Sequence, residues 1–155
     1  PFDFAPSFWD FLRYNIESGK ITVLQKVYDE VIKGNDSLSE WLKDLSFAKI
    51  DHRTPDVLNA YGEVLHHIQC GVSPSGLKLY NDKALQEWAD NSRADAWLIA
   101  AAMAKGYTLV SFEILNSGLG THVCSHPKIP DVADQFSVNC NNLYHMMRVL
   151  GFLFR

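Results

Sequence analysis

The sequence predicts an α/β domain in which a short parallel sheet is covered by helices on both faces. Segments with helical apolar spacing alternate with short β-branched runs along most of the 155 residues. The run at residues 107–112 is apolar with little alternation, which is typical of a strand that is buried on both faces. The length suits one sizeable core, and the chain has no repeat or linker. We therefore expect a single domain over residues 1–155.

The first half of the chain is expected to be mainly helical. Apolar residues at helical spacing predict helices in Pro6–Glu17 and in residues 25–33 and 37–45. A fourth helix should start at Thr54, because a capping residue followed by proline is a strong start signal. The β-branched run at residues 20–24 predicts a strand between the first two helices.

The second half carries the clearest helix–strand unit. Ser92 is a candidate cap for a helix over residues 96–105, and Gly106 suits the left-handed position that ends it. Strands are expected at residues 107–112 and 136–140. Further helices are expected at residues 79–89, 130–135 and 143–150. Three clear strands are few for a parallel sheet that is covered on both sides.

Composition and charge exclude some classes of function. The formal net charge of −4 does not favour nucleic-acid binding by bulk attraction, so such binding would need a local basic patch. The three cysteines are widely spaced, which indicates a reducing compartment without a disulfide framework. No apolar run is long enough to span a bilayer, and no signal peptide is visible. We expect a cytoplasmic protein that is not bound to a membrane.

Four acids stand at the starts of helices or near the ends of strands. Asp95 opens the helix before the central strand, and Glu113 follows that strand. Glu30 comes soon after the first strand, and Asp131 follows Pro130 at another helix start. Ligands of open α/β sheets bind at the carboxyl ends of the strands, so these carboxylates are candidates for one metal site.

Each acid also has an ordinary structural interpretation. Asp95 could only cap its helix, and Asp131 could be a common first-turn acid after proline. Glu30 could be a solvated helix residue, and Glu113 could merely begin a polar loop. Spacing alone does not decide between these alternatives and a metal site.

The order of several short motifs resembles the PIN-domain nucleases, the fold of the VapC-type toxins of bacterial toxin–antitoxin pairs. The motifs are Pro-Phe-Asp-Phe, Lys-Val-Tyr-Asp-Glu, Asp-Ala-Trp-Leu-Ile-Ala and Lys-Ile-Pro-Asp-Val, at residues 1–4, 26–30, 95–100 and 128–132. More narrowly, the chain is similar to an uncharacterised bacterial branch of that superfamily. The resemblance covers essentially the whole chain and implies a three-layer α/β/α fold with a short parallel sheet.

The resemblance also implies an activity. A PIN-type enzyme cleaves RNA phosphodiester bonds with Mg²⁺ or Mn²⁺, which hard oxygen ligands bind. It implies catalytic and metal-binding roles for Glu30, Asp95 and Glu113. Asp131 is a further candidate metal ligand because of its place at another helix start. Arg93 and Lys128 flank candidate acids and could contact phosphates of the substrate, although a solvated surface role is the default interpretation. The expected partners are RNA, an antitoxin protein and a second copy of the chain.

One departure from the family bears on this expectation. The family begins with a central strand that ends in a metal-binding aspartate, and this sequence starts after that point. We therefore expect little ribonuclease activity from the chain as given and more from a form that extends upstream. The alternative is a truncated or degenerate, non-catalytic protein that acts through protein–protein contacts.

Two expectations concern the segment after the central strand. Residues 114–127 are polar and contain glycine, so they should form a loop that is among the least ordered parts of the chain. In that loop, His122, Cys124 and His126 alternate and could face one way in an extended chain. Their spacing matches no zinc pattern, so a soft-metal site there is the weaker interpretation.

Overall fold

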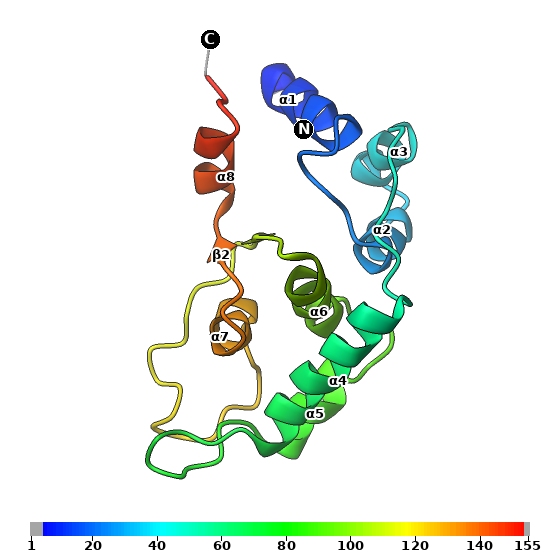
Figure 1. Ribbon diagram of the computed structural model, residues 1–155. Helices are drawn as coiled ribbons and strands as arrows, with labels where there is room; N and C mark the ends of the chain where they lie inside the picture. The colour runs from blue at the N-terminus through cyan, green and yellow to red at the C-terminus, as the bar shows by residue number, and fades with distance from the viewer. Residues whose placement is uncertain (1–4, 154–155) are drawn as a thin grey trace. The chain divides into compact units, whose positions relative to one another are not determined.

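A computed structural model describes residues 5–153 of the chain; residues 1–4 and 154–155, and with them the Pro-Phe-Asp-Phe motif, lie outside the described residues (Figure 1). The chain forms two compact units, which we describe separately. One comprises Pro1–Asp51 with Tyr144–Arg155, and the other comprises His52–Leu143. Within the described residues, no helix is long and apolar enough to cross a membrane.

The first unit is built from helices. They are α1 (Pro6–Glu17), α2 (Gln25–Ile32), α3 (Ser37–Lys43) and α8 (Leu143–Val149), which begins at the boundary of the two units. These bounds confirm the helices that the sequence predicts. The core of this unit consists of Ile16, Leu42 and Leu45, against which partly buried side chains such as Tyr28 and Val31 pack.

The strand that we expected at residues 20–24 is reduced to a single parallel bridge between Leu24 and Ile50. The Ile50 N–H donates to the Val23 carbonyl (3.0 Å), and the Gln25 N–H donates to the Ile50 carbonyl (2.9 Å). Leu24 is already the N-cap residue of α2, so the chain turns into a helix before a ladder can extend. The β-branched run predicted the extended backbone but not its short length.

The second unit contains helices α4 (Pro55–Cys70), α5 (Asp82–Trp88), α6 (Asp95–Lys105) and α7 (Ile129–Gln135). Its core lies chiefly between α4 and α6, where Val64, Ile68 and Ile99 are fully buried. The stacked rings of Tyr61 and Trp97, with centroids 3.7 Å apart, extend this contact. The helix α6 therefore packs closely on another helix, α4.

The sequence predicted the C-terminal end of α6 correctly but not the residue that caps its N-terminal end. Gly106 ends the helix with φ of +68°, the left-handed conformation that was expected. Ser92 does not cap it: the N-cap residue is Ala94 and makes no side-chain capping bond. The Ser92 N–H donates instead to Asp90 Oδ1 (2.8 Å), within the turn that precedes the helix. Asp95 is thus the first helical residue, where the helix dipole favours a negative charge.

The sheet of the second unit has two short strands, β1 (Leu109–Val110) and β2 (Cys140–Asn141). They run parallel, with Leu109 opposite Cys140 and Val110 opposite Asn141. Leu109 is buried and Val110 is exposed, so the expectation of a strand buried on both faces is wrong. The fold is mixed α/β and about half helical, and a three-layer PIN-like arrangement is not confirmed.

An ion pair joins the start of α4 to the end of α6, and its strength should depend on pH. Lys105 Nζ lies 2.6 Å from Asp56 Oδ2. The hydrogen bond from Lys105 lowers the pKa of Asp56 to about 2, below its value of 3.8 in an unfolded chain. Because the folded-state pKa is depressed, the stabilisation is present above the unfolded value and is lost as the pH falls.

We expect the Lys105→Met variant to unfold more easily than the wild type at neutral pH. The difference between their unfolding midpoints should shrink as the pH falls from about 5 to about 2, because Asp56 becomes protonated in both proteins. Denaturant titrations over this pH range measure the difference. A gap that stays constant down to pH 2 would show that packing of the Lys105 stem, not the ion pair, carries the effect.

Candidate active site

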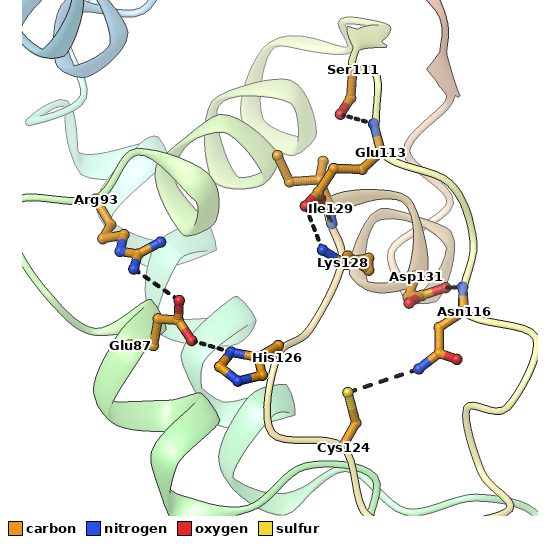
Figure 2. Close-up of polar contacts among 10 residues, drawn as sticks. All are labelled: Glu87, Arg93, Ser111, Glu113, Asn116, Cys124, His126, Lys128, Ile129 and Asp131. Carbon is orange, nitrogen blue, oxygen red and sulfur yellow. Dashed lines mark hydrogen bonds and ion pairs between the residues drawn. The ribbon is translucent and has the colours of Figure 1, made fainter.

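The Glu113 carboxylate connects the end of the short sheet to the start of α7. Its Oε1 accepts a hydrogen bond from Lys128 Nζ (3.1 Å), and its Oε2 accepts one from the Ile129 backbone N–H (2.7 Å) (Figure 2). The Glu113 N–H is held in turn by Ser111 Oγ (3.0 Å). The carboxylate satisfies an N–H of the first turn of α7, which no backbone carbonyl of the helix can reach. Glu113 is therefore not merely the first residue of a polar loop.

Asp95 lies in the same electrostatic environment as Glu113. Burial raises the pKa of Asp95 first, and the negative charge of Glu113 raises it further. Arg93 and Lys128 oppose these effects by stabilising the ionised carboxylate. The effect of the Glu113 charge on the pKa of Asp95 is consistent with the prediction that these two acids lie near each other. A half-buried acid whose pKa is raised by burial and by the charge of a second acid is a common feature of functional sites.

Asp131 is the most buried of the candidate acids, with 4% of its surface exposed. Its Oδ1 accepts a hydrogen bond from the backbone N–H of Asn116 (2.8 Å), and its Oδ2 is buried without a hydrogen-bond partner among the described residues. Burial raises its pKa, the Asn116 bond lowers it, and Glu113 raises it. Because one oxygen anchors a loop, Asp131 does more than occupy a helix start.

The cations that were expected to contact phosphates are both paired. Lys128 binds Glu113, and Arg93 Nη2 lies 2.9 Å from Glu87 Oε1 (Figure 2). The other oxygen of Glu87 lies 2.9 Å from His126 Nδ1. Sequence reasoning missed Glu87, although its charge also raises the pKa of Asp95. No local signal marked it, because its partners come from residues 93 and 126.

Glu30 belongs to the other unit and is exposed on α2. Its approach to Asp95 and Glu113 therefore stays a prediction. The alternating residues of the loop do not form a cluster: His122 Nδ1 lies 3.0 Å from Thr121 Oγ1, Cys124 Sγ lies 3.8 Å from Asn116, and His126 pairs with Glu87.

The donor chemistry of the site suits a hard cation, although its arrangement is incomplete. Across residues 5–153, no three His, Cys, Asp or Glu side chains are placed to hold a metal ion together. Asp95 and Glu113 nevertheless offer carboxylate oxygens, which Mg²⁺ and Mn²⁺ prefer. The Lys128 ammonium already occupies a cation position on Glu113. The two acids thus have the donor chemistry that a hydrated divalent cation needs, and the rest of its coordination shell would have to come from other groups.

The loop over residues 114–127 is irregular but attached at defined points. Asp131 holds its start through the Asn116 N–H, and Asn116 Oδ1 accepts from the Gly118 N–H (3.0 Å). Near its end, the Cys124 N–H donates to the Leu79 carbonyl (2.8 Å). The predicted loop is confirmed, and its expected low order stays a prediction that hydrogen exchange can test.

We expect the Asp131→Ala variant to loosen the start of this loop. Loss of a buried acceptor leaves the Asn116 N–H without its bond, which costs about 1–3 kcal/mol. The exchange of the Asn116 amide should therefore accelerate by about tenfold or more. The matched control is Asp134→Ala, which removes an exposed acid from the same helix. Equal protection of Asn116 in both variants would contradict the anchoring role.

The structure is a mixed α/β protein with two candidate acids at element boundaries. Asp95 is the first residue of α6, and Glu113 follows strand β1. The chain belongs to the family that is described as Domain of unknown function (DUF4411), whose model matches residues 1–154. No curated protein and no solved structure matches the chain. The expectation of an uncharacterised family is confirmed, and the relationship to PIN-domain nucleases is carried by the sequence resemblance alone.

Proposed function

We propose that this protein is a PIN-type, metal-dependent ribonuclease that cleaves RNA phosphodiester bonds as the toxin of a bacterial toxin–antitoxin pair. The observation that carries the proposal is the environment of the half-buried Asp95, whose pKa is raised first by burial and then by the negative charge of Glu113. Two carboxylates whose charges interact repel each other unless a cation or water compensates them. Their positions at a helix start and a strand end suit ligand binding in an α/β fold.

Asp95 and Glu113 would hold Mg²⁺ or Mn²⁺, with Asp131 as a further ligand. When bound, such a cation supplies an activated water and stabilises charge on the phosphate. The protein contributes the placement: α6 fixes Asp95, and the bond from the Ile129 N–H fixes Glu113. Arg93 and Lys128 are paired with Glu87 and Glu113 in this structure, and they would supply the local positive charge that RNA binding by an acidic chain requires once these pairs open.

A second candidate function is supported by the exposed apolar residues in and after β1. Phe112 and Ile114 are 74% and 82% exposed, and Val110 and Leu115 are exposed as well. Such a run favours a protein-binding surface. In this alternative the chain is a non-catalytic protein, and an antitoxin or a second copy would cover the run. Either function would be exercised in the cytoplasm.

The test is cleavage of a mixed RNA pool by the complete gene product that contains this chain. We expect fragments to appear with Mg²⁺ or Mn²⁺ and to disappear when EDTA removes the cation. The alternative predicts no cleavage with either metal, together with a stable complex between the protein and its partner. Cleavage that persists in EDTA would contradict the metal-dependent mechanism.

A further inference from the structure

Lys128 holds one of the two candidate metal ligands in an ion pair. Its Nζ lies 3.1 Å from Glu113 Oε1, and the following residue, Ile129, donates its N–H to Glu113 Oε2 (2.7 Å). Figure 2 shows both contacts converging on the same carboxylate. The two oxygens of Glu113 are therefore engaged by adjacent residues at the start of α7, one through a charge and one through the backbone.

The ammonium of Lys128 is the cation that the structure places on Glu113. Arg93, the other cation that was expected to contact phosphates, has its guanidinium paired with Glu87. Of these two cations, Lys128 is the one that contacts a candidate metal ligand directly.

We propose that Lys128 is the built-in counter-cation of Glu113 and that a divalent cation must displace it from this carboxylate. This inference rests on the proposed function. A metal ion on Glu113 Oε1 would lie about 2 Å from that oxygen. Two cations at such short range repel each other, so the ammonium and the metal ion compete for the carboxylate.

Displacement changes what Lys128 can bind. The ammonium is a compact charge on a flexible stem, and its side chain is 45% exposed. Once it is released, it lies beside the carboxylates, where a phosphate of RNA would approach. Binding of the metal ion would then expose the positive charge that the substrate needs. The phosphate-binding role expected for Lys128 therefore follows metal binding and does not precede it.

The test is the affinity of the chain for Mn²⁺, measured at low ionic strength by the electron paramagnetic resonance signal of the free ion. We expect Lys128→Met to bind Mn²⁺ about two- to fivefold more tightly than the wild type, the range that an exposed ion pair supports. Lys128→Arg keeps the charge and should resemble the wild type. The control is Lys78→Met, which breaks the exposed pair of Lys78 with Asp82 and should leave the affinity unchanged.

A second measurement follows the lysine itself. In the wild type, reductive methylation of Lys128, quantified by mass spectrometry, should become faster when Mn²⁺ is added, whereas that of Lys78 should not. Equal affinities in the wild type and Lys128→Met, or a methylation rate that Mn²⁺ leaves unchanged, would overturn the inference.

The outcomes also separate this inference from the ribonuclease proposal. Tighter binding by Lys128→Met without RNA cleavage would support the counter-cation and refute the nuclease. RNA cleavage together with equal Mn²⁺ affinities of the wild type and Lys128→Met would support the nuclease and refute the counter-cation. No binding of Mn²⁺ by any variant would refute both.

Discussion

In the gene product that is tested for RNA cleavage, Asp95→Asn should lower the rate of metal-dependent cleavage by about 100-fold. The substitution keeps the size of the side chain and removes the charge that would hold a divalent cation. It also ends the coupling with Glu113, which is the observation behind the proposed site. Initial rates with saturating Mn²⁺, measured beside the wild type, determine the loss.

The same variant should not be destabilised. Burial and Glu113 both raise the pKa of Asp95, so ionisation of this acid costs folding free energy at neutral pH. An amide at this position avoids that cost, and we expect a melting temperature equal to or above that of the wild type. The control is Asp82→Asn, which neutralises a first-turn acid of α5 that is 89% exposed. If Asp95→Asn retains full activity, or if Asp82→Asn is equally impaired, Asp95 is not a metal ligand.

Helices were predictable because their signals are local. Pro55 at the first helical position marks the start of α4. Gly106 marks the end of α6, and apolar residues at helical spacing mark the body of each helix. Strands were less predictable, because their length depends on pairing with distant residues. The segments around Leu24 and Val110 have compositions typical of strands. Leu24 nevertheless forms only one β-bridge, and Val110 belongs to a strand of two residues.

Some of the candidate site residues could also be named from local signals in the sequence. Asp95 and Glu113 stand at element boundaries that the sequence marks, so both could be named in advance. The partners of Glu113 and Asp131 could not, because Lys128 and Asn116 reach them only when the chain returns after an irregular loop. Neither the burial of Asp131 nor the contact of Glu87 with Arg93 and His126 has a signature at short range.

The contacts of Glu113 explain why structural and functional interpretations of one acid are compatible. Its bond to the Ile129 N–H positions α7, and its ion pair with Lys128 neutralises its charge. The first contact could persist with a metal ion on the other oxygen, and the second could not. A carboxylate that is held rigidly through one oxygen is a better-placed ligand through the other.

Ile99→Ala should be the most destabilising of the substitutions considered, with a loss of about 2–5 kcal/mol in the free energy of unfolding. Ile99 is fully buried in α6 and belongs to the core cluster that also contains Val64 and Ile68 of α4. Removing its side chain beyond Cβ leaves a cavity that the backbones of two helices cannot close. Ile99→Val removes one methylene and should cost about 1 kcal/mol, so the two variants give a graded series.

The control for this series is Leu58→Ala, which truncates an exposed side chain of α4 and should change the unfolding free energy by less than about 1 kcal/mol. Chemical denaturation followed by tryptophan fluorescence measures all three, since Trp97 lies on α6 and stacks on Tyr61 of α4. A loss below about 1 kcal/mol for Ile99→Ala would mean that α6 is not packed against α4 as described. In that case the rigid placement of Asp95, the first residue of α6, would lose its physical basis as well.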